Sequence, residues 1–237
     1  MADTPFLVTR AEPGASETAA RLREMQLSPV LAPMLTLEVR DVGNMPPANM
    51  LSGLVFTSAN GVRTYAAQRA DRALSAWCVG PATAAAARAA GFAQIHQSSG
   101  NAADLAAFIK AHRMPDPRPL LHVANAAAAG GLKRALEAAG IAVTFAPLYD
   151  MKPADKFPEP VQALLTGVKP GVVLIHSAKG AAAFAALAGA YDLSAWRAVV
   201  ISAPAAAPLT GLKMQDIVIA PHPDEDGLFA ALATLSA

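Results

Sequence analysis

The chain has 237 residues, which fits one large or two small domains, and 54% of them are hydrophobic. Its 19 basic and 18 acidic residues nearly cancel, so the charge pattern excludes a basic surface for nucleic acid. The single cysteine, Cys78, excludes an internal disulfide and lies in an apolar run, where we expect a buried side chain. No secretory segment or membrane-spanning run is found, so we expect a cytoplasmic protein without membrane contact.

Short apolar runs are predicted as strands, and most of them lack the polar alternation of a half-exposed strand. Helical stretches separate most of them, which predicts an α/β fold with parallel sheets. Two sheets of about five strands each would have the flavodoxin-like size. The ten predicted strands are Phe6–Thr9, Pro29–Pro33, Gly53–Thr57, Ala76–Gly80, Gln94–Gln97, Leu120–Val123, Val143–Pro147, Val172–His176, Ala198–Ser202 and Asp216–Ala220.

An internal repeat organises these elements. A strand, a helix and a second strand at the start of the chain align without gaps with residues 120–149, and the later segment Ser58–Gly61 matches Ser177–Gly180. The repeat predicts the order βαβ, three-strand unit, βαβ, three-strand unit; the alternative that all βαβ units look alike stays open. Since the connection at 112–119 is the shortest, the two middle parts are predicted to share one domain. The predicted domains are 38–148 and the discontinuous 1–35 plus 152–237, joined by hinge strands near 35–39 and 148–152, with a ligand cleft between them.

Parallel sheets bind ligands beyond the carboxyl ends of their strands, and several loops there open helices. The free N–H groups of a helix start attract anions. For Ser58, Thr83 and Ser177, a plain role as helix N-cap stays open. The candidate binding residues in these loops are Arg10, Ser58, Asn60, Gly80, Thr83, Asn101, His176, Ser177, Lys179 and Ser202.

Several motifs of other chemistries are missing. The chain has no phosphate-binding G-x-x-x-x-G-K-[ST], no G-x-G-x-x-G and no G-x-S-x-G. The segment His222–Asp226 is interpreted as a solvated loop that opens the last helix rather than as a metal site. His96, His112 and His122 are interpreted as structural or exposed, so no metal site is predicted.

Five segments at these loops form a recognisable set in this order: Val8-Thr9-Arg10, Phe56–Val62, Val79–Ala84, Pro147-Leu148-Tyr149 and His176-Ser177. With this set the sequence resembles the uroporphyrinogen-III synthase family over nearly its whole length. The resemblance implies two flavodoxin-like domains joined by a two-stranded hinge, one domain being discontinuous. It also implies an enzyme without metal or organic cofactor.

The resemblance implies the reaction as well. Linear hydroxymethylbilane, a tetrapyrrole with eight carboxylates, would be closed to uroporphyrinogen III with loss of water and inversion of ring D. The hydroxyl on ring A would leave to give an azafulvene cation, and ring D would attack through its substituted carbon to form a spiro intermediate. Such chemistry asks mainly that the two ends be held together, with acid assistance to the leaving hydroxyl.

The family's hinge tyrosine matches Tyr149, which we expect to supply that assistance; a merely packed aromatic is the alternative. By the same match, Ser58 and Thr83 would bind substrate in the middle domain, and Ser177 and Ser202 in the discontinuous one. Arg10 would pair with a substrate carboxylate. The family often has Gly-x-x-Thr-Ala where this chain has 202–206 without a threonine, so only backbone donors are expected there.

Two other classes share some of these features. A non-catalytic two-domain binding protein or sensor for a small anionic ligand would share the hinge and the helix starts. A receiver-like module would need an acidic cluster at the strand ends, which the predicted strand ends lack. The near balance of charges favours a monomer.

Overall fold

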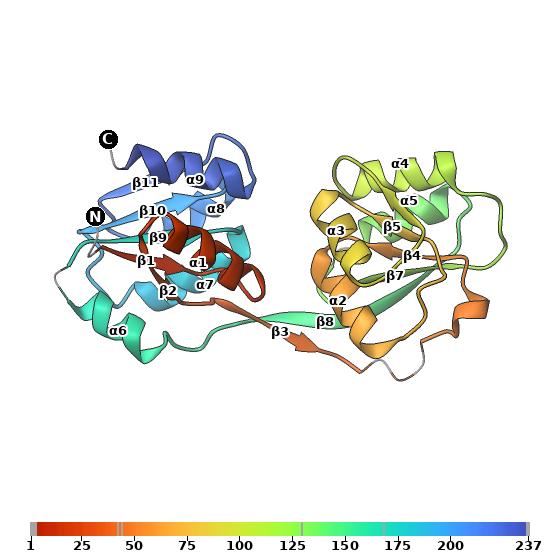
Figure 1. Ribbon diagram of the computed structural model, residues 1–237, viewed down its shortest axis with the longest axis horizontal. Coiled ribbons are helices and arrows are strands. Elements are labelled where there is room, and N and C mark those ends of the chain that lie inside the picture. The colour runs from red at the N-terminus through yellow and green to blue at the C-terminus, as the bar shows by residue number, and fades with distance from the viewer. Residues whose placement is uncertain (1–3, 42, 44, 129, 168, 236–237) are drawn as a thin grey trace. The chain divides into compact units, whose positions relative to one another are not determined.

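A computed structural model describes residues 4–235 except 42, 44, 129 and 168. The chain divides into two compact units. Unit 1 consists of Met1–Leu37 with Met151–Ala237, and unit 2 is Glu38–Asp150 (Figure 1). The chain therefore leaves unit 1 after one βαβ element and returns to it after unit 2. The predicted domain ends at residues 1 and 237 lie outside the described residues.

Unit 1 has a five-stranded sheet in the order β11-β10-β9-β1-β2, and its neighbouring strands pair in parallel. Counted along the unit's own chain from the β2 edge, this is the flavodoxin-like order 2-1-3-4-5. The strands are apolar on both faces because helices cover both. Their bounds are β1 Pro5–Val8, β2 Ser28–Leu31, β9 Gly171–Ile175, β10 Trp196–Val200 and β11 Asp216–Ile219.

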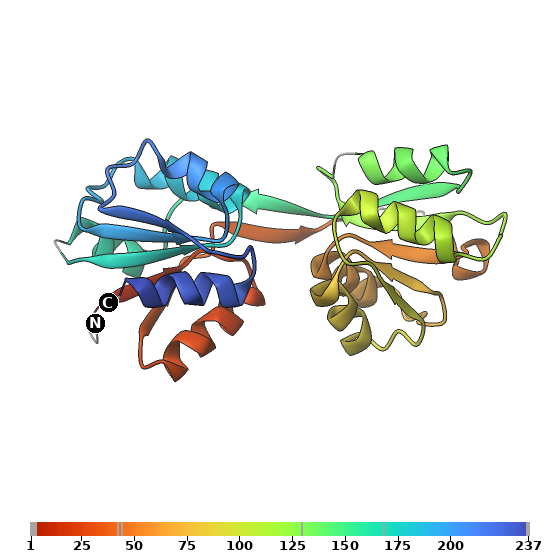
Figure 2. The ribbon, with the colours of Figure 1, turned by 90° about the horizontal axis from the view of Figure 1, so that it is seen from above.

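Two hydrophobic cores sandwich this sheet (Figure 2). Phe6 and Val8 pack with α1 and α9, whereas Leu7 between them packs with α6, α7 and α8, as the two-residue period of a strand requires. The helices are α1 Gly14–Glu24, α6 Glu159–Thr166, α7 Ala178–Ala188, α8 Ala203–Ala206, the 3₁₀ turn η2 Ala207–Leu209 and α9 Glu225–Thr234.

Unit 2 repeats the architecture. The sheet has the order β3-β8-β7-β4-β5-β6. The neighbouring strands from β8 across to β6 pair in parallel. Helices α2 and α3 pack on one face, and α4 and α5 on the other (Figure 2). The elements are β3 Leu35–Val39, η1 Ala48–Met50, β4 Gly53–Phe56, α2 Ala59–Gln68, β5 Ala76–Cys78, α3 Pro81–Ala89, β6 Ile95–Gln97, α4 Ala102–His112, β7 Leu120–Asn125, α5 Gly131–Ala138 and β8 Val143–Pro153.

The predicted α/β class with two flavodoxin-like parallel sheets is confirmed. The apolar runs marked ten of the eleven strands that the described residues form. The eleventh, β3, coincides with the segment near 35–39 that was expected as a hinge strand. It lies beside β8 at a sheet edge, and its residues are half-buried or exposed, so it lacks the apolar run that marked the others. None of the helices within the described residues could span a bilayer.

Candidate functional site

Several of the predicted site residues lie where the strand order of each sheet reverses, and the others follow neighbouring strands. In unit 1 this switch point lies between β1 and β9, whose ends lead to Arg10 and His176. In unit 2 it lies between β7 and β4, whose ends lead to Asn125 and Ser58. Open α/β sheets bind their ligands at such points, because the helices on either side diverge there. The two switch points are therefore the candidate site of each unit.

In unit 2 the switch point holds a pair of hydroxyl groups. Ser58 is the N-cap of α2, and its Oγ accepts a hydrogen bond from the Gly61 N–H at 3.2 Å. The same Oγ lies 2.7 Å from the hydroxyl of Tyr149, and either oxygen can be the donor. A backbone hydrogen bond from Asn125 also reaches the Tyr149 hydroxyl. A residue beyond the end of β4 and the last residue of β7 thus converge on a phenol carried by β8.

A β-bulge sets the position of Tyr149. The register between β7 and β8 shifts after Ala124, which pairs with Pro147, so that Asn125 pairs with Tyr149. One extra residue, Leu148, is accommodated in β8 by this shift. Bulges twist a strand and re-aim the side chains that follow. The bulge brings the tyrosine to the level of Asn125, where its hydroxyl meets Ser58.

The Tyr149 phenol is protonated at neutral pH. Burial raises the pKa of Tyr149 above its ordinary value, while the hydrogen bonds from Ser58 and from the Asn125 backbone oppose that rise. The same two bonds would stabilise the oxygen if it lost its proton. Chemically, the group can donate a proton or a hydrogen bond and take the proton back.

Four other predicted residues of unit 2 lie at its strand ends. Asn60 is in the first turn of α2, and its Oδ1 accepts from Arg63 at 3.2 Å. Gly80 is the N-cap of α3, and there is open space where a side chain would stand. Thr83 lies inside α3 and is buried, so an N-cap role for it is ruled out. Asn101 caps α4 in a reciprocal capping box with Asp104.

In unit 1 the switch point holds an ion cluster. Nη1 of Arg10 donates to Oε2 of Glu225 at 3.1 Å, and Nε2 of His176 lies 3.3 Å from the same oxygen. The hydroxyl of Thr18 donates to the other carboxylate oxygen at 2.6 Å. The His176 contact is within ion-pair distance but outside hydrogen-bond geometry, since both ring nitrogens are buried without a hydrogen-bond partner among the described residues.

The interpretation of 222–226 as a solvated loop was half right. Asp224 caps α9 as expected, but Glu225 is drawn into the ion cluster. Burial acts to raise its pKa, but the close contact with His176, the bond from Thr18 and the charges of His176 and Arg10 outweigh it and hold the pKa of Glu225 at about 2. Glu225, Thr18 and Asn125 were missed. Only Asn125 had a sequence signal, since it comes soon after the predicted strand Leu120–Val123; in the structure it is the last residue of β7.

The remaining candidates of unit 1 lie at the starts of α7 and α8. Ser177 caps α7 by accepting from the Gly180 N–H at 3.0 Å, as Ser58 caps α2. Nζ of Lys179 donates to the Met151 carbonyl at 2.7 Å. Ser202 stands at the N-cap position of α8 without a side-chain capping bond. The backbone donors of that helix start are therefore what the loop offers.

The side chains that were set aside as structural are packed as expected. Cys78 is buried, and burial raises the pKa of its thiol to about 11. His122 is buried, which lowers its pKa to about 4, and the His96 ring stacks on Trp77 at 4.1 Å. Within the described residues, no group of three or more acidic, histidine or cysteine side chains is placed to hold a metal ion.

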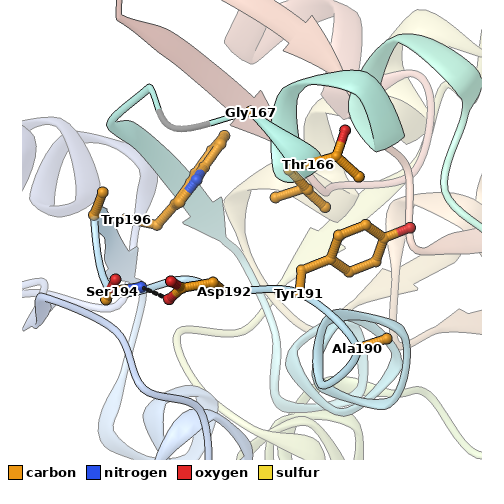
Figure 3. Close-up of a pocket in the computed structure, with 9 residues that line it drawn as sticks. Thr166, Gly167, Ala190, Tyr191, Asp192, Ser194 and Trp196 are labelled. Carbon is orange, nitrogen blue, oxygen red and sulfur yellow. Dashed lines mark hydrogen bonds between the residues drawn. The ribbon is translucent and has the colours of Figure 1, made fainter.

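A pocket of about 290 Å³ opens at the opposite, amino edge of the unit 1 sheet (Figure 3). It is lined by residues 165–167, 190–192 and 194–196. The Thr166 hydroxyl donates to the Gln162 carbonyl, and Asp192 accepts from the Ser194 N–H. The indole N–H of Trp196 is buried without a hydrogen-bond partner among the described residues. The Tyr191 hydroxyl points away from Trp196 (Figure 3). This pocket does not share residues with the switch-point site.

The fold and the residues at the strand ends define a class of protein. It is an α/β protein of two flavodoxin-like units, in which the second unit interrupts the chain of the first. Polar or charged side chains lie at the switch point of each sheet. The family model of uroporphyrinogen-III synthase HemD matches residues 16–230. The chain belongs to the uroporphyrinogen-III synthase family.

Solved structures agree with that assignment. The uroporphyrinogen-III synthetase of Helicobacter pylori 26695 is similar, with a TM-score of 0.68 at 15% identity over 98% of this chain and 99% of that one. A mutant uroporphyrinogen III synthase of the extremely thermophilic bacterium Thermus thermophilus gives a TM-score of 0.54 at 17% identity over 98% of this chain and 97% of that one. At these identities the likeness concerns the fold. Comparison with curated proteins gives no match.

Proposed function

We propose that this chain closes hydroxymethylbilane to uroporphyrinogen III, with inversion of ring D and loss of water. It is an enzyme of porphyrin biosynthesis by its family, which acts on a tetrapyrrole. The observation that supports a chemical role for the site is the Tyr149 hydroxyl, held 2.7 Å from Ser58 at the switch point of unit 2. No cofactor enters the proposed reaction.

Tyr149 is proposed to act as the acid. Its phenol donates to the oxygen of the ring A hydroxymethyl group while the carbon–oxygen bond breaks, and water leaves with that proton. Ser58 and the Asn125 backbone then hold the phenolate oxygen. After ring D has attacked through its substituted carbon and rearranged through the spiro intermediate, the last proton leaves the closing carbon and returns to Tyr149. Over the whole reaction the substrate loses one molecule of water, and Tyr149 ends with the proton it started with.

The charged groups of unit 1 are proposed to bind carboxylates. The Arg10 side chain is 38% exposed, and its guanidinium keeps donors beyond the one given to Glu225. Ser177, Ser202, Gly80 and their neighbours present helix-start N–H groups, which favour anions. Asn60, Thr83, Asn101 and Lys179 are further proposed contacts of the substrate. Binding by many donors fits a reaction that needs chiefly positioning.

The test is the identity of the ring isomer. The chain is incubated with freshly made hydroxymethylbilane, the products are oxidised, and the porphyrin isomers are separated by chromatography. Predominant type III product is expected. Type I product alone, which forms without an enzyme, would leave only a binding protein or sensor for an anion.

The proposed enzyme works as a monomer in the cytoplasm and does not bind nucleic acid. The near balance of 19 basic and 18 acidic residues supports this. Size-exclusion chromatography with light scattering checks the first point: a particle of about the chain mass of 24.3 kDa is expected.

A further inference from the structure

One carboxylate ties together the ends of three elements in unit 1. Glu225, at the start of α9, receives Arg10 from the end of β1, His176 from the end of β9 and Thr18 from α1. Thr18 and His176 are buried, so two of the three partners have no freedom to turn to solvent. A carboxylate with partners on both oxygens has one orientation.

The turn that carries Glu225 is itself fixed. Oδ1 of Asp224 accepts from the Gly227 N–H at 2.7 Å. A Cβ atom on Gly227 would stand 2.2 Å from the His222 carbonyl oxygen, so only glycine allows this close approach. The position at the first turn of α9 also favours a negative charge. The backbone places the carboxylate, and the carboxylate then sets its partners.

Arg10 is held from two sides. A Cβ atom on Gly14 would lie 2.3 Å from Nε of Arg10, so the arginine side chain occupies the space that the glycine leaves. Its Nη1 is bonded to Glu225, the one hydrogen-bond partner its guanidinium has among the described residues. A guanidinium has five N–H donors in a rigid plane. Fixing one corner of that plane aims the other donors.

We infer that Glu225 is a positioning residue: it holds Arg10 in the orientation in which Arg10 receives a carboxylate of the tetrapyrrole. The inference rests on the proposed function and adds a residue to it. Glu225 does not contact the substrate itself, because two carboxylates repel each other. It acts through the geometry of Arg10, while the buried His176 and Thr18 hold the Glu225 carboxylate in place.

The main variant is Glu225→Gln in the full chain. The amide keeps the size and an oxygen for Thr18 but loses the charge that anchors Arg10. The KM for hydroxymethylbilane is expected to rise about tenfold with kcat within about twofold, as for a lost ground-state contact. The double variant Arg10→Ala/Glu225→Gln should be no worse than Arg10→Ala, since Glu225 acts through Arg10.

The matched control is Asp226→Asn. Asp226 is the next residue on α9 and pairs with Arg21 at 2.6 Å, with 87% of its side chain exposed. This variant removes the same charge from the same helix turn and should leave KM unchanged. A second probe is Gly14→Ala, which keeps every charge but displaces Arg10; it should raise KM as Glu225→Gln does.

The possible results distinguish a failure of the proposed function from a failure of the positioning role of Glu225. Wild-type chain that yields no type III product overturns the proposed function. Active wild type with an unchanged KM in Glu225→Gln overturns the positioning role, and a lowered KM does so too, because Glu225 would then compete with the substrate for Arg10. If circular dichroism shows that Glu225→Gln does not fold, the KM of Gly14→Ala decides instead: a raised KM supports the positioning role, and an unchanged or lowered KM overturns it.

Discussion

The switch points of the two units use the same place in the same sheet order for different chemistry. In unit 2 the Tyr149 phenol is contacted by the Ser58 hydroxyl and by the backbone of Asn125, and none of these groups is charged. In unit 1 an arginine, a histidine and a glutamate form a charged cluster. Both units start the following helix with a capping serine. The difference teaches that the fold supplies a location, while the side chains set its chemistry: a protonated phenol in unit 2 and a charged cluster in unit 1.

The largest effect on turnover is expected from a change at Tyr149, in the unit 2 switch point. We expect Tyr149→Phe to lower kcat by about 10- to 100-fold, because the phenol's acid assistance is lost while positioning remains. KM should change little. Initial rates of type III formation give the result, and circular dichroism confirms folding.

The control for that variant is Tyr65→Phe. The Tyr65 hydroxyl donates to Asp71 at 2.6 Å in the same unit, away from the switch point. Its loss should lower stability without lowering kcat. Unchanged turnover in Tyr149→Phe would remove the acid role and leave positioning alone as the mechanism.

The charged cluster at the unit 1 switch point predicts a pH dependence of stability that the neutral hydroxyl pair at the unit 2 switch point does not. The folded pKa of Glu225 is about 2, below its ordinary 4.5. Its ionised form therefore stabilises the fold fully above about pH 4.5, and this contribution is lost as the pH falls through the folded value. Relative to Glu225→Gln, wild type should be more stable by about 2 kcal/mol at pH 7, allowing for partial solvation.

Urea titrations at pH 7 and pH 3 measure that advantage. At pH 3 the unfolded carboxylate is mostly protonated while the folded one is not, so the advantage should shrink to roughly half or less. An advantage that is equal at both pH values would mean that the ion cluster does not shift the pKa of Glu225.

The two capping serines sharpen the comparison. Ser58→Ala and Ser177→Ala should each lower the free energy of unfolding by about 1 kcal/mol, since each removes an N-cap bond. Only Ser58 also contacts Tyr149, so Ser58→Ala should lower kcat several-fold. Ser177→Ala should act on KM through the adjacent His176. Identical kinetic effects would contradict the division of roles.

The smallest effect is expected at the third serine. Ser202 makes no side-chain capping bond, and the loop offers backbone donors. Ser202→Ala should change the free energy of unfolding by less than about 0.5 kcal/mol and KM by less than about twofold. Thermal unfolding and initial rates check both. A large rise in KM would show that the hydroxyl itself binds substrate.

The sequence by itself determined the features that depend on residues close together in the chain, namely strands and helix starts. Apolar runs marked ten of the eleven described strands, and the Ser58 and Ser177 helix starts followed from residues three apart. The remaining strand, β3, has no apolar run because it lies at a sheet edge, and the layout of the repeat predicted it as a hinge strand. Local patterns therefore predicted the class and the location of the candidate site.

Only the tertiary structure decided which distant groups meet. Arg10 and Glu225 are 215 positions apart, and Ser58 and Tyr149 are 91 apart. Their contacts depend on sheet order, on the packing of α9 beside α1 and on one bulge in β8, none of which leaves a local signal. Glu225 looked like a solvated acid because sequence position shows a charge but not what lies across the fold from it.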